Sequence, residues 1–501
     1  MKINFINDPN TFSESNCEVH FFYKVDDDIQ LSQSANGLLD KTLLQNKSKG
    51  KFLDSFFITH DNRDVLFISL GDTSKLDEPK LEKVGGAIYT KLQERGTRGK
   101  VKVFVDKDIK ISVKYNTATS KWGNTSIASI AFGVQLKEYK FDKYFTKKDK
   151  EETSFEIDII QDTDLVKLKE EYKTKDAMIQ GISFAKDLIS EPSNVLYPQS
   201  YADKVLSMGV DTGLNIKVYG EKELEEMGAG ALLAVGQGSA RESKMVVMEW
   251  MNGNQEDPTM ALVGKGVCFD TGGYSIKPSK GLKDMKYDMG GSAVVVGTMM
   301  SLALRKAKVN AVGVIGLVEN MVSSTAYKPG DVITSMSGQT IEIDNTDAEG
   351  RVVLADCLWY TQKTYKPKTM INLATLTGAV SVALGDQLAG LFSNNDEISN
   401  QLIEAGKQVN EEVWRLPCDP IGERYDKYVD STIADMHNVG KGYEASSTTA
   451  AQFLQRFVND VPWAHLDIAG VTWNDKGSMT AKGGATGWGV KLLNKWIDNN
   501  G

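Results

Sequence analysis

The stretch TMALVGKGVCFDTGG (residues 259–273) decides the fold class of this chain. Its first nine residues are mostly apolar and predict a buried strand that ends near Asp270. A helical pattern follows at 292–307 (SAVVVGTMMSLALRKA), and a second apolar strand at 311–319 (AVGVIGLVE). Apolar strands separated by helices are typical of a mixed, largely parallel sheet that is covered on both faces.

The same alternation extends to both sides of this stretch. Further strands are predicted at 215–220, 244–250, 369–378 and 463–470, and a further helix at 350–365. The C-terminal block is therefore predicted to be one large α/β domain.

The N-terminal part predicts a smaller α/β domain. Strands are predicted at 65–71 and 100–106, helices at 81–96 and 126–145 (the latter amphipathic), and a last strand within 145–158. A long helix with a polar first half is predicted over 162–189. Because 501 residues exceed one ordinary core, two domains are expected. We place a domain that provides scaffold and oligomer contacts at 1–165, a linker helix at 166–190, and the larger domain at 191–501.

Composition narrows the class of protein. The chain is 41% hydrophobic and 25% charged, with a net charge of -9, which argues against a protein that coats nucleic acid. The four cysteines are widely spaced and suggest neither a zinc knuckle nor a disulfide framework. The start, MKINFINDPN, lacks an apolar signal core, and the longest apolar runs are too short to span a bilayer. We expect a cytoplasmic enzyme or binding protein without membrane partners.

Carboxylates gather at the ends of predicted elements. Asp347 and Glu349 are two residues apart, so in extended backbone they share a face and repel each other unless a cation lies between them. Asp270 ends a predicted strand, and Asp288 precedes a glycine-rich helix start. Since the chain has only four histidines, this set favours a hard or borderline divalent cation, or a pair of cations.

Two lysines and an arginine accompany these carboxylates. Lys265 interrupts an apolar strand, so it either pairs with an aspartate or binds a metal as a neutral amine. Lys277 lies in the loop after Asp270, and Arg351 follows Glu349 by two residues. His465 lies within an apolar strand pattern and is predicted to be a core residue rather than a catalytic one.

Several motifs resemble one known family. NTDAEGRV (345–352) is nearly the signature of the leucyl aminopeptidase (cytosol aminopeptidase) family. VGKGVCFDTGGYSIKPS (263–279) and MKYDMGG (285–291) are similar to its other metal-binding segments. The resemblance runs in order through residues 165–501, whereas the N-terminal part is matched mainly by LKEYKFDKY (136–144).

The resemblance implies a metal-dependent aminopeptidase that removes N-terminal residues, apolar ones preferred, from peptides during intracellular turnover. It implies a homo-hexamer and two divalent ions per subunit, Mn²⁺ or Zn²⁺, with Co²⁺ and Mg²⁺ as alternatives. A hydroxide that bridges the ions would attack the peptide carbonyl.

The resemblance also implies roles for individual residues. Carried over to this sequence, the metal ligands are Lys265, Asp270, Asp288, Asp347 and Glu349, with Asp270 and Glu349 serving both ions. Lys277 and Arg351 would be catalytic, with a bicarbonate at Arg351 as general base. The substrate-binding residues would be Met285, Asn345, Thr375, Leu376 and Gly378.

Three other functions remain open from the residues alone. One is a two-metal hydrolase of another ester or amide class, such as phosphate esters, since Lys277 and Arg351 would also suit a phosphate. Another is an additional DNA-binding regulatory role, which the acidic net charge does not support. In the third, the N-terminal domain binds a small molecule, although it has no glycine-rich phosphate loop.

Overall fold

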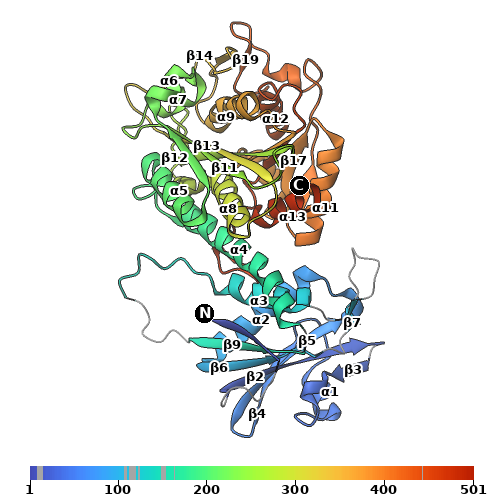
Figure 1. Ribbon diagram of the computed structural model, residues 1–501. Coiled ribbons are helices and arrows are strands. Elements are labelled where there is room, and N and C mark those ends of the chain that lie inside the picture. The colour runs from blue at the N-terminus through green and yellow to red at the C-terminus, as the bar shows by residue number, and fades with distance from the viewer. Residues whose placement is uncertain are drawn as a thin grey trace. The chain divides into compact units, whose positions relative to one another are not determined.

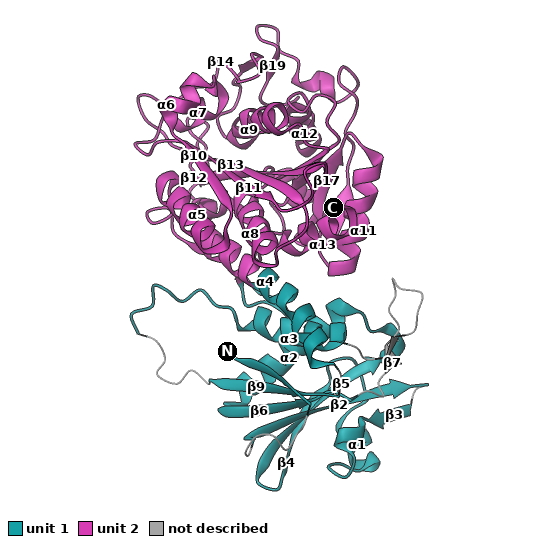
Figure 2. Ribbon diagram, in the orientation of Figure 1, with its two compact units in different colours: residues 1–179, 476–483 teal, residues 180–475, 484–501 magenta. Residues whose placement is uncertain are grey.

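The computed structural model describes residues 1–7, 15–26, 28–106, 124–147, 154–162, 164–442 and 444–501, and the backbone of 110–111 and 120–121. The chain forms two compact units (Figure 2). Unit 1 comprises residues 1–179 and 476–483, and unit 2 comprises residues 180–475 and 484–501. Helix α4 (Leu165–Ser190), where a long helix was predicted, begins in unit 1 and ends in unit 2. Within the described ranges, no helix is both long and apolar enough to cross a membrane.

Unit 1 is built on a mostly parallel sheet (Figure 1). Its strands are β1 (Ile3–Ile6), β2 (Cys17–Val25), β3 (Asp28–Leu31), β4 (Ser55–His60), β5 (Arg63–Asp72), β6 (Gly99–Phe104) and β9 (Phe155–Ile160). Their order is β1-β9-β6-β2-β5-β4, with β3 beside β2. The pairs β1/β9, β9/β6, β6/β2 and β2/β5 are parallel, and β4/β5 and β2/β3 are antiparallel. The strands predicted at 65–71 and 100–106 are β5 and β6, and the last predicted strand is β9.

The helices of unit 1 are α1 (Lys41–Lys47), α2 (Glu78–Arg95) and α3 (Asn124–Glu138). Helix α2 begins where the Asp77 carboxylate accepts a hydrogen bond from the Lys80 backbone N–H (2.9 Å), and it ends at Gly96, which is left-handed (φ 72°). Helix α3 differs from the prediction of an amphipathic helix over 126–145. It ends at Glu138 and is buried on most sides, because it packs against α2 so closely that a Cβ at Gly133 would lie 1.9 Å from the Glu82 carbonyl oxygen. A helix enclosed on most sides has no polar face to present.

Unit 2 contains a mixed sheet of eight strands. They are β10 (Asn215–Tyr219), β11 (Lys244–Met251), β12 (Thr259–Asp270), β13 (Asn310–Asn320), β16 (Thr369–Ala374), β17 (Ala389–Ser393), β18 (Val413–Arg415) and β20 (Trp463–Asp467). The order is β10-β11-β13-β12-β16-β20-β17-β18, and β13, β12, β16 and β20 form a parallel core. All six predicted strands of this domain are present, whereas β17 and β18 were not predicted.

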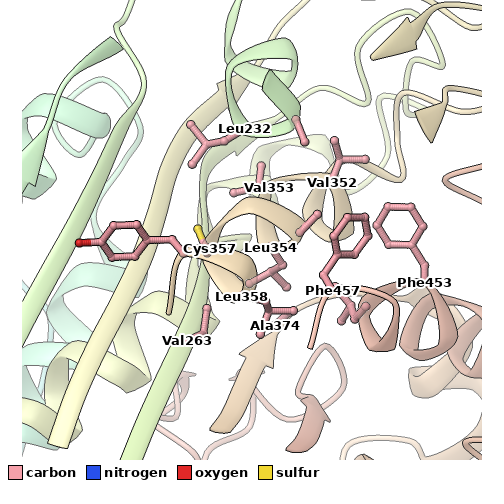
Figure 3. Close-up of a cluster of buried hydrophobic side chains, with 14 of the residues drawn as sticks. Leu232, Val263, Val352, Val353, Leu354, Cys357, Leu358, Ala374, Phe453 and Phe457 are labelled. Atoms are coloured by element: carbon pink, nitrogen blue, oxygen red, sulfur yellow. The ribbon is translucent and has the colours of Figure 1, made fainter. Parts of the chain in front are cut away.

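Helices cover both faces of this sheet, as the alternation predicts. Figure 1 shows α7 (Gly230–Gly236), α9 (Glu349–Tyr365) and α12 (Ser446–Gln455) on one face, and α5 (Pro198–Thr212), α8 (Gly290–Leu304) and α13 (Val490–Asn500) on the other. Figure 3 shows the buried side chains of α9 packed with those of α7, of α12 and of the sheet. This core fixes α9, and with it the helix start at Glu349, against the strands.

The four parallel strands bring their carboxyl ends to one edge of the sheet. Their register aligns Asp270 of β12 with Asn320 of β13, and Ala374 of β16 with Asp467 of β20. In α/β sheets, ligands bind at this edge.

Candidate metal centre

Asp270 lies at the carboxyl end of β12, and its side chain is held from two directions. One carboxylate oxygen accepts hydrogen bonds from the Gly272 backbone N–H and the Asn320 amide, each at 2.8 Å. Gly272 and Gly273 are left-handed (φ 86° and 63°), which turns the chain back toward the strand end. The other carboxylate oxygen is therefore left for Lys277, whose Nζ lies 2.7 Å away.

Lys265 is buried, with 3% of its side chain exposed. Its Nζ lies 2.9 Å from Asp288 and 2.8 Å from Glu349, and it donates to the Thr375 carbonyl oxygen at 2.9 Å. Burial alone would lower the pKa of Lys265, but the Asp288 and Glu349 carboxylates raise it above its ordinary value. A Cβ at Gly350 would lie 2.5 Å from the lysine stem, so the glycine of the NTDAEGRV motif makes room for this side chain.

Asp347 and Glu349 both face this cluster, but not for the reason that the sequence suggested. Their backbone is not extended, since Thr346 and Asp347 form a turn and Ala348 leads into α9, which begins at Glu349. The prediction that Gly350 marks the helix start is one residue late. Nevertheless, ligand oxygens of Asp270, Asp347 and Glu349 lie within 4.8 Å of one another. The turn and the helix start, rather than a shared strand face, bring the two carboxylates together.

The cluster has the donor set of a divalent cation site. Asp288 Oδ2 and Glu349 Oε2 are buried and have no hydrogen-bond partner among the described residues. Burial raises the pKa of Asp288 well above its ordinary value, and burial together with the Glu349 and Asp270 carboxylates raises the pKa of Asp347 to about 7. Buried carboxylate oxygens without partners are costly, and a cation would compensate them. The residues therefore fit one or more divalent metal ions.

Lys277 and Arg351 flank the cluster in different ways. The Lys277 side chain is 21% exposed and pairs with both Asp270 and Asp347. Burial opposes its charge, but Asp270 and Glu349 raise its pKa above the ordinary value. Arg351 is buried, its Nε has no partner among the described residues, and burial lowers its pKa to about 10.

Of the predicted substrate-binding residues, Thr375 and Asn345 contact the cluster, and the other three lie close to cluster residues in the sequence. The Thr375 hydroxyl donates to Asp288 at 2.7 Å. Leu376 and Gly378 continue this loop, and Gly378, the first residue of α10 (Gly378–Leu384), is exposed. Met285 is half-buried in a 3-10 helix that ends just before Asp288. Asn345 has a structural contact, since its side chain accepts from the Asp347 backbone N–H at 2.7 Å.

The sequence reasoning missed two groups that hold the cluster in place. Asn320 donates to both Asp270 (2.8 Å) and the Thr346 carbonyl oxygen (2.9 Å), which ties two strand-end loops together. Asp467 accepts from the Leu376 backbone N–H (3.1 Å) and the Thr377 hydroxyl (2.6 Å). Like Asp270, both residues are polar and end an apolar strand. A search of the sequence for polar residues at the ends of apolar runs would have identified both.

The histidines stand outside the cluster. His465 is a buried core residue, as predicted. Its Nδ1 lies 2.9 Å from the Asn372 amide, although its Nε2 has no partner among the described residues, and burial lowers its pKa to about 3. His437 lies 2.8 Å from Asp344 in a second group that also includes Glu342. That group is partly exposed, and Glu342 already accepts a hydrogen bond from the Ser431 hydroxyl.

Comparison with known proteins assigns the chain to a family. Residues 183–494 match the model of the cytosol aminopeptidase family, catalytic domain, and residues 23–148 match that of the N-terminal domain of the same family. The chain is 50% identical over 455 residues to a probable cytosol aminopeptidase of Ehrlichia ruminantium (strain Gardel), covering 89% of this chain and 87% of the relative. It is 46% identical over 483 residues to one of Rickettsia felis, covering 94% and 93% of the two chains.

A solved structure shares the fold. The bottromycin maturation enzyme BotP, solved in complex with Mn, has a TM-score of 0.82 and 27% identity, over 97% of this chain and 99% of that chain. The chain belongs to the cytosol aminopeptidase family. It is a metal-dependent aminopeptidase, as the motifs predict, with the two-domain α/β fold of that family.

Proposed function

We propose that this enzyme binds two divalent metal ions through Lys265, Asp270, Asp288, Asp347 and Glu349, and that it removes apolar N-terminal residues such as leucine from peptides. The convergence of Asp270, Asp347 and Glu349 carries the proposal, because their ligand oxygens lie within 4.8 Å of one another. Asp270 and Glu349 would serve both ions. Mn²⁺ and Zn²⁺ are the proposed ions, with Co²⁺ and Mg²⁺ as alternatives, and the Mn named for the BotP structure favours Mn²⁺.

Bound at this cluster, the ions would supply Lewis-acid chemistry and an activated water. Lys277 would stabilise the negative charge that grows on the carbonyl oxygen, because its ammonium is the most exposed cation of the cluster. Because Asp270, Asp288, Asp347 and Glu349 would all bind the metal ions, none of these carboxylates would be free to act as the general base. An anion at Arg351, proposed to be bicarbonate, would take the proton, and the free Nε of this buried guanidinium supports an anion there.

Two loops beside the cluster support the preference for apolar residues. Met285 precedes Asp288 by three residues, and Leu376 follows Thr375, whose carbonyl oxygen accepts from Lys265. Both side chains are half-buried and can offer apolar surface to the first residue of a substrate. Asn345, Thr375 and Gly378 would shape the same pocket.

We also propose that the enzyme acts in cytoplasmic peptide turnover as a homo-hexamer. The names of the relatives support the compartment, and the hexamer rests on the family resemblance. Light scattering on the purified protein would measure the oligomer mass, and a stable monomer would contradict this part.

The test of the activity is metal analysis coupled to an assay with leucine-p-nitroanilide. EDTA treatment should abolish turnover, and re-added Mn²⁺, Co²⁺ or Zn²⁺ should restore it with two ions per chain. Full activity without metal would overturn the proposal. Faster turnover of a phosphomonoester under the same conditions would favour the ester hydrolase instead. A gel shift at physiological salt would test the DNA-binding role.

A further inference from the structure

Unit 1 contains a cavity of about 750 Å³ that the aminopeptidase activity does not use. Its walls come from the ends of β2 and β5, the turn after α1, the segment that links β5 to α2, and the first turn of α2. All of these lining residues belong to unit 1, whereas the metal cluster belongs to unit 2. Cavities of this size accommodate small organic ligands.

The position of the cavity in the sheet is one where ligands bind. Strands β2 and β5 are parallel neighbours, so their carboxyl ends open on the same edge. In α/β sheets, ligands bind outside the carboxyl ends of the strands, and the ends of β2 and β5 both line this cavity.

The walls are positively charged, in contrast to the net charge of -9 of the whole chain. Four lysines line the cavity (Lys24, Lys51, Lys75 and Lys80), against two aspartates. One of these, Asp72, already accepts from the Ser74 backbone N–H (3.0 Å) and hydroxyl (2.6 Å) and pairs with Lys75 at 3.1 Å. With four lysines against two aspartates, the walls carry a net positive charge, which favours an anion.

The cavity also has an apolar wall. Phe52 is half-buried there, beside Val25, Leu70 and Leu76. Gly71, near the end of β5, is left-handed (φ 66°), and a Cβ at this position would lie 3.1 Å from the Cβ of Phe52, so the end of β5 lies directly against this residue. Lysines suit phosphate groups, and an aromatic and aliphatic wall suits an organic ring.

We propose that this cavity binds a small organic phosphate of the nucleoside diphosphate type, with Lys51 and Lys80 on the phosphates and Phe52 beside the ring. The absence of a glycine-rich phosphate loop from the sequence of this domain does not oppose such a site, because lysine side chains supply the positive charge that such a loop supplies through backbone N–H groups. The site is separate from peptide hydrolysis, so its failure would leave the aminopeptidase proposal standing.

The test is calorimetric titration of the full chain with ADP, alongside adenosine and inorganic pyrophosphate. We expect saturable binding of one ADP per chain that weakens as salt is raised. Pyrophosphate should bind more weakly than ADP, and adenosine should show no charge-dependent binding. Pyrophosphate binding as tight as that of ADP would overturn the role of the apolar wall, and no saturable binding of ADP would overturn the site.

Variants locate the binding. The double variant Lys51→Gln/Lys80→Gln should lose affinity for ADP by about tenfold or more, because two charge-assisted contacts are removed. The control Lys91→Gln removes an exposed lysine of α2 that pairs with Glu94 and does not line the cavity, so its affinity should equal that of the parent. All variants should keep the parental melting temperature.

A second control separates this site from the metal cluster, which also attracts phosphates. The variant Asp270→Ala, which should lose its metal ions, should bind ADP as the parent does. Loss of ADP binding in Asp270→Ala, or parental binding in Lys51→Gln/Lys80→Gln, would place the ligand outside the cavity and overturn the proposal.

Discussion

The two units share an architecture but differ at the ends of their strands. Each has a largely parallel sheet, and in each an aspartate ends a strand, Asp270 in unit 2 and Asp72 in unit 1. Asp270 is 1% exposed, and its neighbours at the sheet edge, Asn320 and Asp467, are equally buried. The Asp72 side chain is 42% exposed and pairs with a surface lysine. Burial of polar groups at strand ends costs stability, so the edge that retains them, in unit 2, is the edge proposed to carry the chemistry.

The strongest test of this contrast replaces each of the two strand-end aspartates in a separate variant. Asp270→Ala should lose metal and lower kcat/KM for leucine-p-nitroanilide by about 10³-fold or more, because a ligand proposed to serve both ions is removed. Asp72→Ala should stay within about twofold of the parent. Elemental analysis of both variants completes the measurement, and two ions per chain in Asp270→Ala would disprove the shared-ligand role.

The next test separates charge stabilisation from metal binding. Lys277→Ala should lower kcat by about 10²–10³-fold, the range for loss of one group that stabilises transition-state charge. Its metal content should remain that of the parent. Lys75→Ala, which removes the lysine paired with the strand-end aspartate of unit 1, serves as the matched control with unchanged kcat. Loss of metal from Lys277→Ala would show that this lysine holds the cluster together instead.

Much of unit 2 could be predicted because its sequence signals are local. Apolar runs predicted its central strands, and glycine-rich turns beside carboxylates pointed to the residues that form the carboxylate cluster, which is proposed to bind metal. Asp347 and Glu349 were predicted to face the same way because they would share one face of a strand. In the structure, a turn and the start of α9 bring them together instead. Residues two apart share a face only in extended backbone. Asn320 and Asp467 could have been found as polar strand ends, but the residues that they contact could not, because those contacts depend on the order of strands that are distant in the sequence.

Unit 1 was harder to predict for a physical reason. The pattern of α3 suggested an exposed polar face, but close packing on α2 through Gly85 and Gly133 buries most of its sides. The lysines of the unit 1 cavity come from segments between positions 24 and 80, and each alone resembles a solvated surface lysine. Only the sheet order brings them to one edge.

A smaller effect is expected from a residue that supports the site without touching the ligands. Asp467→Ala should lower kcat/KM by about 10- to 100-fold, because the loop that carries Thr375 and Leu376 loses two of its hydrogen bonds. Metal content should not change. Asp467→Asn keeps one acceptor and should recover part of the loss. Equal activity of Asp467→Ala and the parent would mean that the loop is held without this carboxylate.

The smallest effect on activity should come from a matched pair of core changes. Val103 on β6 and Val263 on β12 are both fully buried strand residues, one in each unit. Their replacement by alanine should destabilise each unit by about 2 kcal/mol, from two lost methyl groups and the cavity that they leave. Hydrogen exchange, which resolves individual strands, would measure both losses of stability.

The two variants should differ in activity. Val263→Ala should reduce kcat severalfold, because β12 carries Lys265 and Asp270, whereas Val103→Ala should leave kcat within about twofold. An equal reduction in both variants would mean that the strands of unit 1 position the chemistry as much as those of unit 2 do, and the contrast between the units would then fail.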